Sequence, residues 1–377
     1  MTSENRAEVV DARQRILLSL RLLMPALLPV AAALQYIVHC NPVWTFITGA
    51  IAVAALADWI RQATDQIAAH AGPAIGGLLT ISFGSIAELL LAFFVLLDAG
   101  PAIVRAQITG SIIGTSLLGL GLAILAGGVR FGRQTFNRER AGLLTSMLVL
   151  VVIALLLPAI FDLASGARQL RGPTRLVSDE SLSLGVSMVL LLLYGGNLAF
   201  TLVTHRDVFS SPNEEAHRKA TWSLARSLSL LAAATIASAF GAELVSSAMQ
   251  ATAQSLGLPL LFLGVIPLAL IGTSSDLLAA VAFGRQNRMG LAMGICVGSS
   301  IQAALVIAPL LVSASWVIGR PMTLVFSDPL ELFAIAATAF IVNSIARDGE
   351  TTWFEGLLLV GVYTLLALAF FFTGPRA

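Results

Sequence analysis

About eleven long apolar segments, separated by short polar stretches, constrain this chain of 377 residues more than any other feature. A helix that crosses a bilayer needs about 20 mostly apolar residues, and runs of this length are too long for barrel strands. A water-soluble domain could not enclose the apolar surface of a chain with 57% hydrophobic and 11% charged residues. We therefore predict an all-α polytopic membrane protein with about eleven transmembrane helices. The expected spans are 16–38, 43–60, 75–97, 103–127, 143–163, 184–204, 228–249, 259–283, 289–312, 330–345 and 354–372.

The arginine residues predict how these helices are oriented. With eleven spans, most arginines fall on the side of the membrane that holds the N-terminus, including the cluster at 130–140 and Arg285. We call this the arginine-rich side. The opposite side receives chiefly the group at 168–175 and Arg320. Because loops rich in Lys and Arg stay in the cytoplasm, we expect a cytoplasmic N-terminus and an integral location in the plasma or inner membrane.

The sequence contains an internal repeat. The stretch "GSIAELLLAFF" from Gly84 aligns with "GTSSDLLAAVA" from Gly272, and the same register without a gap aligns "GSIIGTSLLGL" from Gly110 with "GSSIQAALVIA" from Gly298. The third and fourth spans thus correspond to the eighth and ninth. An offset of five spans is odd, so the two halves must be inverted in the bilayer, as in many secondary transporters. The predicted divisions are 1–41 (N-terminus and first helix), 42–205 (first repeat), 206–221 (cytoplasmic linker) and 222–377 (second repeat).

Each half of the repeat carries one acid in an apolar span, Glu88 in the first and Asp276 in the second. An ionised carboxylate inside a bilayer costs about 3 kcal/mol or more, so it is normally protonated, paired or bound to a cation. No Lys, Arg or His lies inside the spans of the two motifs away from their ends. The negative charge of two carboxylates is balanced by one divalent cation or by two protons, and binding of the cation excludes the protons. The pair therefore predicts a cation/proton antiporter in which both acids bind the metal ion and carry the protons.

Small polar residues accompany both acids. Ser85 lies three positions before Glu88 and Thr273 three before Asp276, so each pair shares a helix face. A glycine followed by a small polar residue also favours local unwinding, which would free backbone carbonyls as ligands. We expect a hard cation such as calcium, which takes six to eight oxygen ligands, to draw on these groups. The further candidates for the site are Ser111, Ser299, Ser300 and Gln302, with Glu243 as a candidate for gating or proton access.

Other interpretations stay open at this point. A membrane acid can be a protonated packing residue, the serines can serve close helix packing, and Gln302 can be an interhelical contact. The cation can equally be sodium, potassium or another divalent ion. Two acids could also activate water in an intramembrane hydrolase, although the four histidines lie in loops or at span ends. A membrane scaffold without transport is the last alternative.

At these motifs the chain resembles the calcium/proton exchangers of the CAX type, within the cation/calcium exchanger superfamily. The family signature of the form GNATEL stands as "GSIAEL" from Gly84, and its second signature, GNAAEH, as "GTSSDL" from Gly272. The stretches "AQITGSIIGTSLLGLGLAILAGGVRFGRQTFN" and "MGLAMGICVGSSIQAALVIAPLLV" are also similar to the family. The resemblance, which runs from about residue 27 to the C-terminus, implies export of cytosolic Ca2+ in exchange for H+. By position, it places the cation-binding acids on Glu88 and Asp276.

The resemblance also implies eleven helices, as one N-terminal helix plus two inverted five-helix repeats, and alternating access. In this sequence Ser85 and Thr273 replace the signature Asn, and the second acid is the shorter Asp276. The expected partners are the lipid bilayer and an inorganic cation substrate, with Ca2+ and H+ as transported ions. We expect no cofactor, no enzymatic activity and no nucleic-acid partner, and the sequence leaves the oligomeric state open.

Overall fold

The computed structural model describes residues 24–38, 41–167, 173–200, 220–326 and 328–373. Within these residues, nine helices are long and apolar enough to cross a membrane. Two shorter apolar elements, α2 (Leu27–Ala33) with its flanking turns and α4 (Ile86–Asp98), bring the number to eleven. The predicted all-α architecture is therefore confirmed. The start of the first predicted span, 16–23, and most of the predicted linker, 206–219, lie outside the described residues.

The second predicted span and the start of the third form one helical run, α3 (Pro42–Gly84). It begins after Asn41, whose side chain accepts a hydrogen bond from the Val43 N–H at 3.0 Å. In a straight helix, residues eight positions apart are separated by about 12 Å along the axis. An ideal Cβ on Gly76 would nevertheless lie 2.5 Å from the Ala68 carbonyl oxygen. The run therefore bends back on itself near Gly76, so that the two spans are joined without an intervening loop.

The remaining helices follow the predicted order, and three of their spans contain a π-helical segment, labelled η, as does the first span in η2 (Leu34–Val38). The segments η3 and η6 occupy corresponding positions of the two repeats, directly after the paired "GS" motifs, and π-helical turns are frequent at functional sites. The elements are α5 (Pro101–Ile113), η3 (Gly114–Gly119), α6 (Leu120–Phe131), α7 (Arg138–Ala167), α8 (Pro173–Ala199), α11 (Leu224–Leu256), α12 (Leu260–Leu263), η5 (Gly264–Leu268), α13 (Ala269–Arg285), α14 (Met289–Gln302), η6 (Ala303–Ile307), α15 (Ala308–Ile318), α16 (Pro329–Ala346) and α17 (Trp353–Thr373).

Polar residues at helix ends fix where several of these helices start and stop. Ser223 caps α11 by accepting a hydrogen bond from the Arg226 N–H at 3.3 Å, and Gly257 ends it in the left-handed conformation that glycine adopts without strain. Asp328 caps α16 by accepting from the Leu330 N–H at 2.8 Å. These caps satisfy backbone groups that a helix end would otherwise leave unpaired.

Contacts between loops show which loops share a side of the membrane. The strands β1 (Arg133–Thr135) and β2 (Glu350–Thr352) pair in an antiparallel ribbon, so the connections after α6 and after α16 lie together. At the other end, the Arg105 guanidinium in α5 donates to the Thr323 carbonyl oxygen at 3.1 Å, which joins the start of α5 to the connection after α15. Eleven spans require both pairings.

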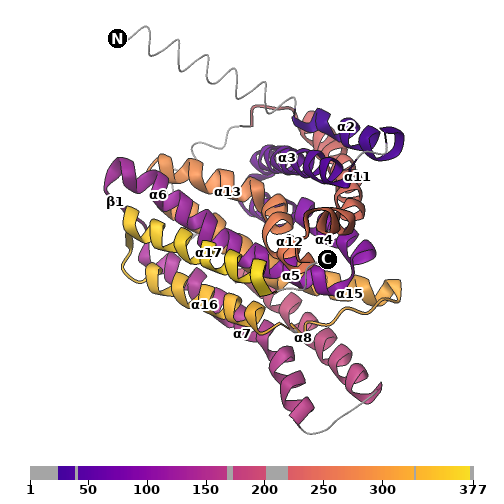
Figure 1. Ribbon diagram of the computed structural model, residues 1–377. Helices are drawn as coiled ribbons and strands as arrows, with labels where there is room; N and C mark the ends of the chain where they lie inside the picture. The colour runs from indigo at the N-terminus through magenta and orange to yellow at the C-terminus, as the bar shows by residue number, and fades with distance from the viewer. Residues whose placement is uncertain (1–23, 39–40, 168–172, 201–219, 327, 374–377) are drawn as a thin grey trace.

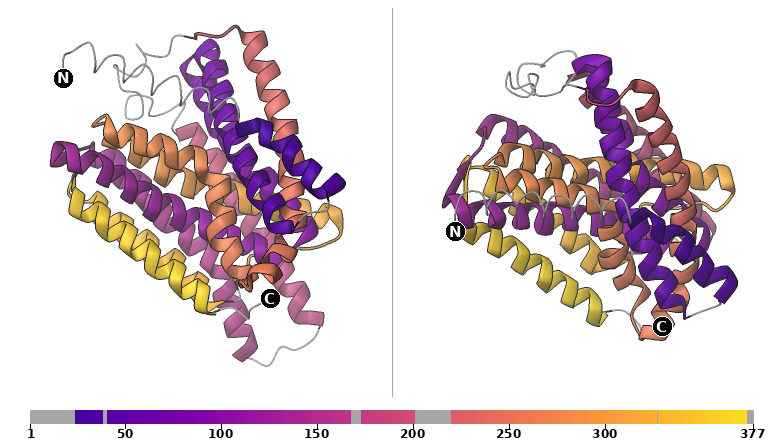
Figure 2. Two further views of the ribbon diagram at one scale, coloured as in Figure 1. Left: turned by 45° about the horizontal axis from the view of Figure 1, so that its top comes forward. Right: turned by 90° about the horizontal axis from the view of Figure 1, so that it is seen from above.

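The helices are arranged as a bundle of α2, α3 and α11 beside a larger group (Figure 1). Helices α3 and α11 lie side by side in all views, and α6 lies against both α13 and α17 (Figure 2). The two "GS" spans pack against each other in opposite directions: Ser300 of α14 meets the turn after α5, while an ideal Cβ on Gly290, at the start of α14, lies 3.7 Å from the Phe136 Cβ, beyond the end of α6. This antiparallel contact is the one that an inverted repeat requires.

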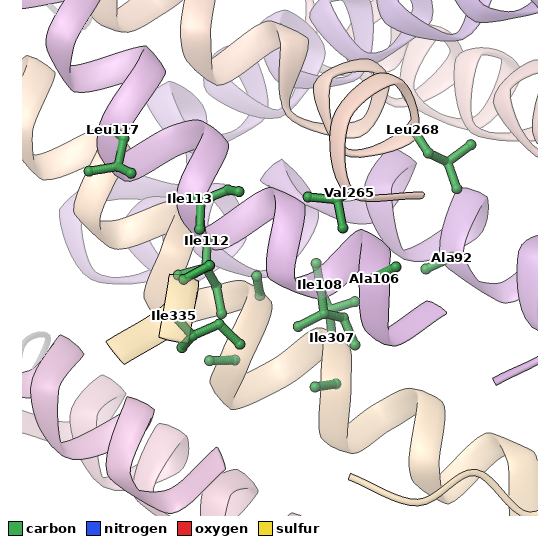
Figure 3. Packing of buried hydrophobic residues seen from close by; sticks show 14 of the residues in the cluster. Ala92, Ala106, Ile108, Ile112, Ile113, Leu117, Val265, Leu268, Ile307 and Ile335 are labelled. Atoms are coloured by element: carbon green, nitrogen blue, oxygen red, sulfur yellow. The ribbon is translucent and has the colours of Figure 1, made fainter. Parts of the chain in front are cut away.

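A continuous apolar core surrounds α5. Ile112 of this helix lies toward Ile335 of α16 and Ile108 toward Ile307 of η6, while Val265 of η5 lies on the opposite side of α5 (Figure 3). Burial of these side chains holds α5 between α16 and η5, because each removes apolar surface from contact with solvent. This packing fixes the position of the polar residues that follow Ile108 on α5.

Candidate cation-binding site

Glu88 lies in the first turn of α4, directly after a break in the helix. Helix α3 ends at Gly84, Ser85 leaves the helical conformation with φ −101° and ψ 14°, and α4 begins at Ile86. The interruption predicted from the glycine is therefore present in this half. The break places Glu88, which is only 3% exposed, in the first turn of a helix, where the helix dipole favours a negative charge.

Asp276 has a different setting, because α13 continues without a break through Gly272 and Thr273. The expected unwinding at this glycine is wrong: the interruption comes earlier, in η5, where Pro267 lacks the N–H that a regular helix would use. The hydroxyl of Thr273 donates to the Ala269 carbonyl oxygen of its own helix at 2.8 Å. Thr273 is thus a buried residue whose hydroxyl is already bonded, and Ser85 has no structural counterpart there.

The two acid-bearing helices cross at Gly272. An ideal Cβ at this glycine would lie 3.1 Å from the Glu88 Cγ and 3.4 Å from its Cβ, so any larger residue would push α13 away from Glu88. The negative charges of Glu88 and Asp276 are close enough to act on each other. The motifs of the two repeats, 188 positions apart in sequence, therefore meet at one place in the bundle.

Each acid faces the serine of its own repeat. Ser299 of α14 donates a hydrogen bond to the Asp276 Oδ2 at 2.7 Å. Ser111 of α5, the repeat-related residue, lies beside the Glu88 carboxyl group, although its hydroxyl completes no geometrically sound hydrogen bond there. The acid and serine predicted in each half are thus brought together in both halves.

Gln302 joins the site from the opposite repeat. Its Oε1 accepts a hydrogen bond from the Ser85 hydroxyl at 2.7 Å, so the break before Glu88 is held against the end of α14. Ser300 lies on another face of α14, where its hydroxyl is 2.6 Å from both Thr115 Oγ1 and Ser116 Oγ. The structure therefore places Ser300 between helices rather than at the acids. The partners Thr115 and Ser116 were not singled out in the sequence.

Two charged residues of α3 also act on the site. Arg61 and Asp65 are within electrostatic range of Asp276, and Arg61 also forms an ion pair with Asp58 at 3.8 Å. They belong to a different span from the motif, so motif matching gave no signal for them. Glu243, the candidate for gating, is exposed on α11, and in the described part of the chain no side-chain hydrogen bond or ion pair joins it to either acid.

The two halves differ in how well their site-facing surfaces are covered. On α5 the face that leads from the start of the helix to the site is buried at every position: 103, 107, 110, 111 and 114. On α14 four of the five repeat-related positions, 291, 295, 298 and 302, are partly exposed, and only Ser299 is buried. The partly exposed stripe starts beside Arg288, on the arginine-rich side, and ends at Gln302. The site is therefore less covered along α14 than along α5.

The ligands available at this site are all oxygens: two carboxylates, hydroxyls and one amide. Within the described ranges, no group of three or more His, Cys, Asp or Glu side chains could hold a metal ion. An ion bound here would be held by two acids together with neutral oxygens, which suits a hard cation that must be released again. Neither acid forms an ion pair in the part of the chain that the structure describes.

The fold and the site define a membrane transporter with one acid at the site from each of two inverted halves. Residues 41–203 and 226–372 match the family model of the sodium/calcium exchanger proteins, and the chain belongs to this family. It is a secondary transporter and not an enzyme. It is 38% identical to the Ca(2+)/H(+) antiporter of Aphanothece halophytica over 89% of this chain and 91% of that protein. It is 34% identical to the Ca(2+)/H(+) antiporter ChaA of Bacillus subtilis (strain 168) over 89% of this chain and 94% of that protein.

Solved structures support the same conclusion. The structure of native YfkE matches with a TM-score of 0.79 and 30% identity, and covers 93% of this chain and 98% of that one. The H+/Ca2+ exchanger CAX matches with a TM-score of 0.70 over 95% of this chain and 92% of that one, at 15% identity, which supports the fold. The resemblance to CAX-type exchangers is confirmed.

The two neighbouring serines of α14 are expected to differ sharply when replaced. Ser299→Ala removes the hydroxyl that donates to Asp276 and should weaken cation binding about tenfold, because hydrogen bonds to charged groups contribute about 1.5–3 kcal/mol. Ser300→Ala should leave binding nearly unchanged but lower stability by about 1–3 kcal/mol, because it removes the partner of the buried Ser116 hydroxyl and one of the two contacts of the Thr115 hydroxyl, which also donates to the Ser111 carbonyl oxygen. Cation titrations and thermal unfolding of both variants would show this; the reverse pattern would contradict the assignment.

Proposed function

We propose that this protein exchanges Ca2+ for H+ and exports calcium from the cytosol, with Glu88 and Asp276 as the shared binding groups. The observation that carries the proposal is the meeting of two acids from inverted repeats, the buried Glu88 and the partly buried Asp276, where Glu88 packs against Gly272 of the Asp276 helix. The relatives named as Ca(2+)/H(+) antiporters support calcium as the cation, since they match over nearly the whole chain. The two matched stretches also support a division into repeats at 42–205 and 222–377.

The exchange follows from the charges at the site. Two ionised carboxylates bind one Ca2+, and two protons neutralise the same carboxylates once the ion has left. Either form leaves no uncompensated charge in the bilayer, whereas the empty ionised pair would cost several kcal/mol. The empty ionised site therefore rarely changes sides, and this couples the two ion movements.

The neutral oxygens complete the coordination that calcium prefers. Ser299 and Gln302 lie beside Asp276 and Ser85, and Ser111 lies beside Glu88. With the two carboxylates and water, these groups can supply the six to eight oxygens of a calcium site. The partly exposed stripe on α14 supports access from the arginine-rich side, which we propose is the cytoplasm of a plasma or inner membrane. We propose that the inverted repeats exchange roles to give access from the other side.

Everted membrane vesicles with an acidic interior test the proposal directly. Addition of Ca2+ should release protons and accumulate Ca2+, while Na+, K+ and Mn2+ should give smaller responses. A response to Na+ or K+ without one to Ca2+ would assign the same site to another cation, and no response to any ion would refute the proposal.

The replacement of the signature Asn by Ser85 provides a test of selectivity. In Ser85→Asn, the amide N–H can donate to the Gln302 Oε1 in place of the hydroxyl, which leaves an additional amide oxygen free for the ion. We expect a higher apparent affinity for Ca2+ in the same vesicles. Thr273→Asn is the matched comparison and should give no gain, because Thr273 is buried at a continuous helix. Equal gains would contradict the asymmetry between the two motifs.

A further inference from the structure

Gln107 of α5 is a buried polar residue without any role in the site described above. Its side chain is 1% exposed, and neither its amide oxygen nor its amide nitrogen has a hydrogen-bond partner in the described part of the chain. Leaving buried polar groups unpaired is costly, and native structures contain few of them. Such a residue therefore requires an ordered water molecule, a bound ion or another conformation to satisfy its amide group.

Gln107 lies one helical turn before Ser111, on the same face of α5. The Ser111 hydroxyl is likewise buried, and its contact is with the Glu88 carboxyl group. Between them lies Gly110, where the Val265 carbonyl oxygen of η5 makes close contact. Oxygen atoms of Glu88, Ser111 and Gln107 thus follow one another from the acids toward the start of α5.

The unpaired polar atoms are confined to this face of α5. On the opposite face, the Thr109 hydroxyl donates to the Glu331 Oε1 at 3.5 Å, and Arg105 is bonded to the connection after α15. Polar residues of α5 that only hold helices together therefore have partners. On the face toward η5 and the acids, Gln107 has no partner among the described residues and Ser111 contacts the Glu88 carboxyl group.

The corresponding position of the second repeat carries no polar side chain. The position in α14 that corresponds to Gln107 is Ile295, which is partly exposed. In the proposed access from the arginine-rich side, the ion retains water along the partly exposed stripe of α14. On the buried α5 side there is no such opening, and an ion leaving the acids would lose ligands unless the protein supplied an oxygen.

We propose that Gln107 and Ser111 form a second cation position, on the side of the acids that faces the start of α5, which the ion occupies as it leaves Glu88 for the face opposite the arginine-rich side. The Gln107 Oε1 and the Ser111 hydroxyl replace water ligands there until the path along η5 opens. This inference rests on the proposed cation exchange and adds a residue that acts at one membrane face only.

The test compares Ca2+/H+ exchange in vesicles of both orientations for wild type and Gln107→Leu. With Ca2+ added at the arginine-rich face, the apparent affinity should stay within about twofold of wild type. With Ca2+ added at the opposite face, it should weaken about tenfold, as expected for the loss of one contact to a charged group. Thermal stability should be unchanged or higher, because the leucine removes a buried amide without partners. Gln107→Glu keeps the side-chain oxygens and should retain the affinity at the opposite face.

Thr109→Val is the matched control, since it removes a buried polar group from the other face of the same turn of α5 and should not distinguish the two membrane faces. An equal effect of Gln107→Leu at both faces, or no effect at either, would overturn the inference. So would a loss of stability in Gln107→Leu, which would show that the amide holds the fold together. Absence of exchange in the wild type would instead refute the proposed function.

Discussion

Replacing Glu88 by Gln or Asp276 by Asn is expected to abolish exchange. Each change keeps the shape of the side chain but removes one of the two negative charges that neutralise the cation. Removing one partner of a buried charged set costs about 3–5 kcal/mol, which corresponds to a loss of affinity on the order of 100-fold or more. Cation-dependent proton release from everted vesicles should fall to background in both variants, with the amount of protein in the membrane unchanged.

Glu243→Gln is the matched control for this experiment. It also neutralises a glutamate of a membrane helix, but Glu243 is exposed on α11 and not at the acids. We expect exchange close to that of wild type. Full exchange in either Glu88→Gln or Asp276→Asn would refute the central role of the pair, and a complete loss in Glu243→Gln would assign that residue a direct part in proton access.

Gly110→Ala should destabilise the protein strongly, while Gly298→Ala at the repeat-related position should not. A Cβ on Gly110 would overlap the Val265 carbonyl oxygen and lie 2.6 Å from the Ala269 Cβ. No long flexible side chain can yield there, so α5 and η5 must separate, and overpacking of this kind costs about 1–3 kcal/mol or more. Among the residues that the structure describes, no neighbouring atom lies within 4 Å of a Cβ on Gly298. Thermal unfolding of the two variants measures this difference.

Measuring ion exchange by the same two variants tests whether the two halves alternate, so that α14 becomes covered when α5 opens. If α14 becomes covered when α5 opens, the added methyl group of Gly298→Ala will obstruct the second state, and exchange will fall although stability is retained. Gly142→Ala, in α7 with no atom within 4 Å of its Cβ, controls for the general effect of replacing a helical glycine. Wild-type exchange in Gly298→Ala would contradict the exchange of roles, and wild-type stability in Gly110→Ala would contradict the close contact.

The residues predicted as ligands separate into groups only in the folded chain. Ser111 and Ser299 lie at the acids, and Gln302 lies at the break before Glu88. Ser300 and Thr273 share the same sequence motifs, yet their hydroxyls are used in packing between helices and within a helix. A "GSS" motif cannot distinguish adjacent serines, because the helix points them in directions about 100° apart and only the neighbouring helices decide what each one meets.

The sequence by itself determined the number of spans, the inverted repeat and the pair of acids. These properties are local, since hydropathy is set by about 20 consecutive residues and the repeat by matching letters. Only the tertiary structure decided that α3 breaks at Ser85 while α13 continues past Gly272, that Arg61 acts on Asp276, and that Gly110 is covered while Gly298 is open. Two repeats with the same glycines can lie in different surroundings, because the distance between packed helices depends on the whole bundle and is not encoded at either glycine.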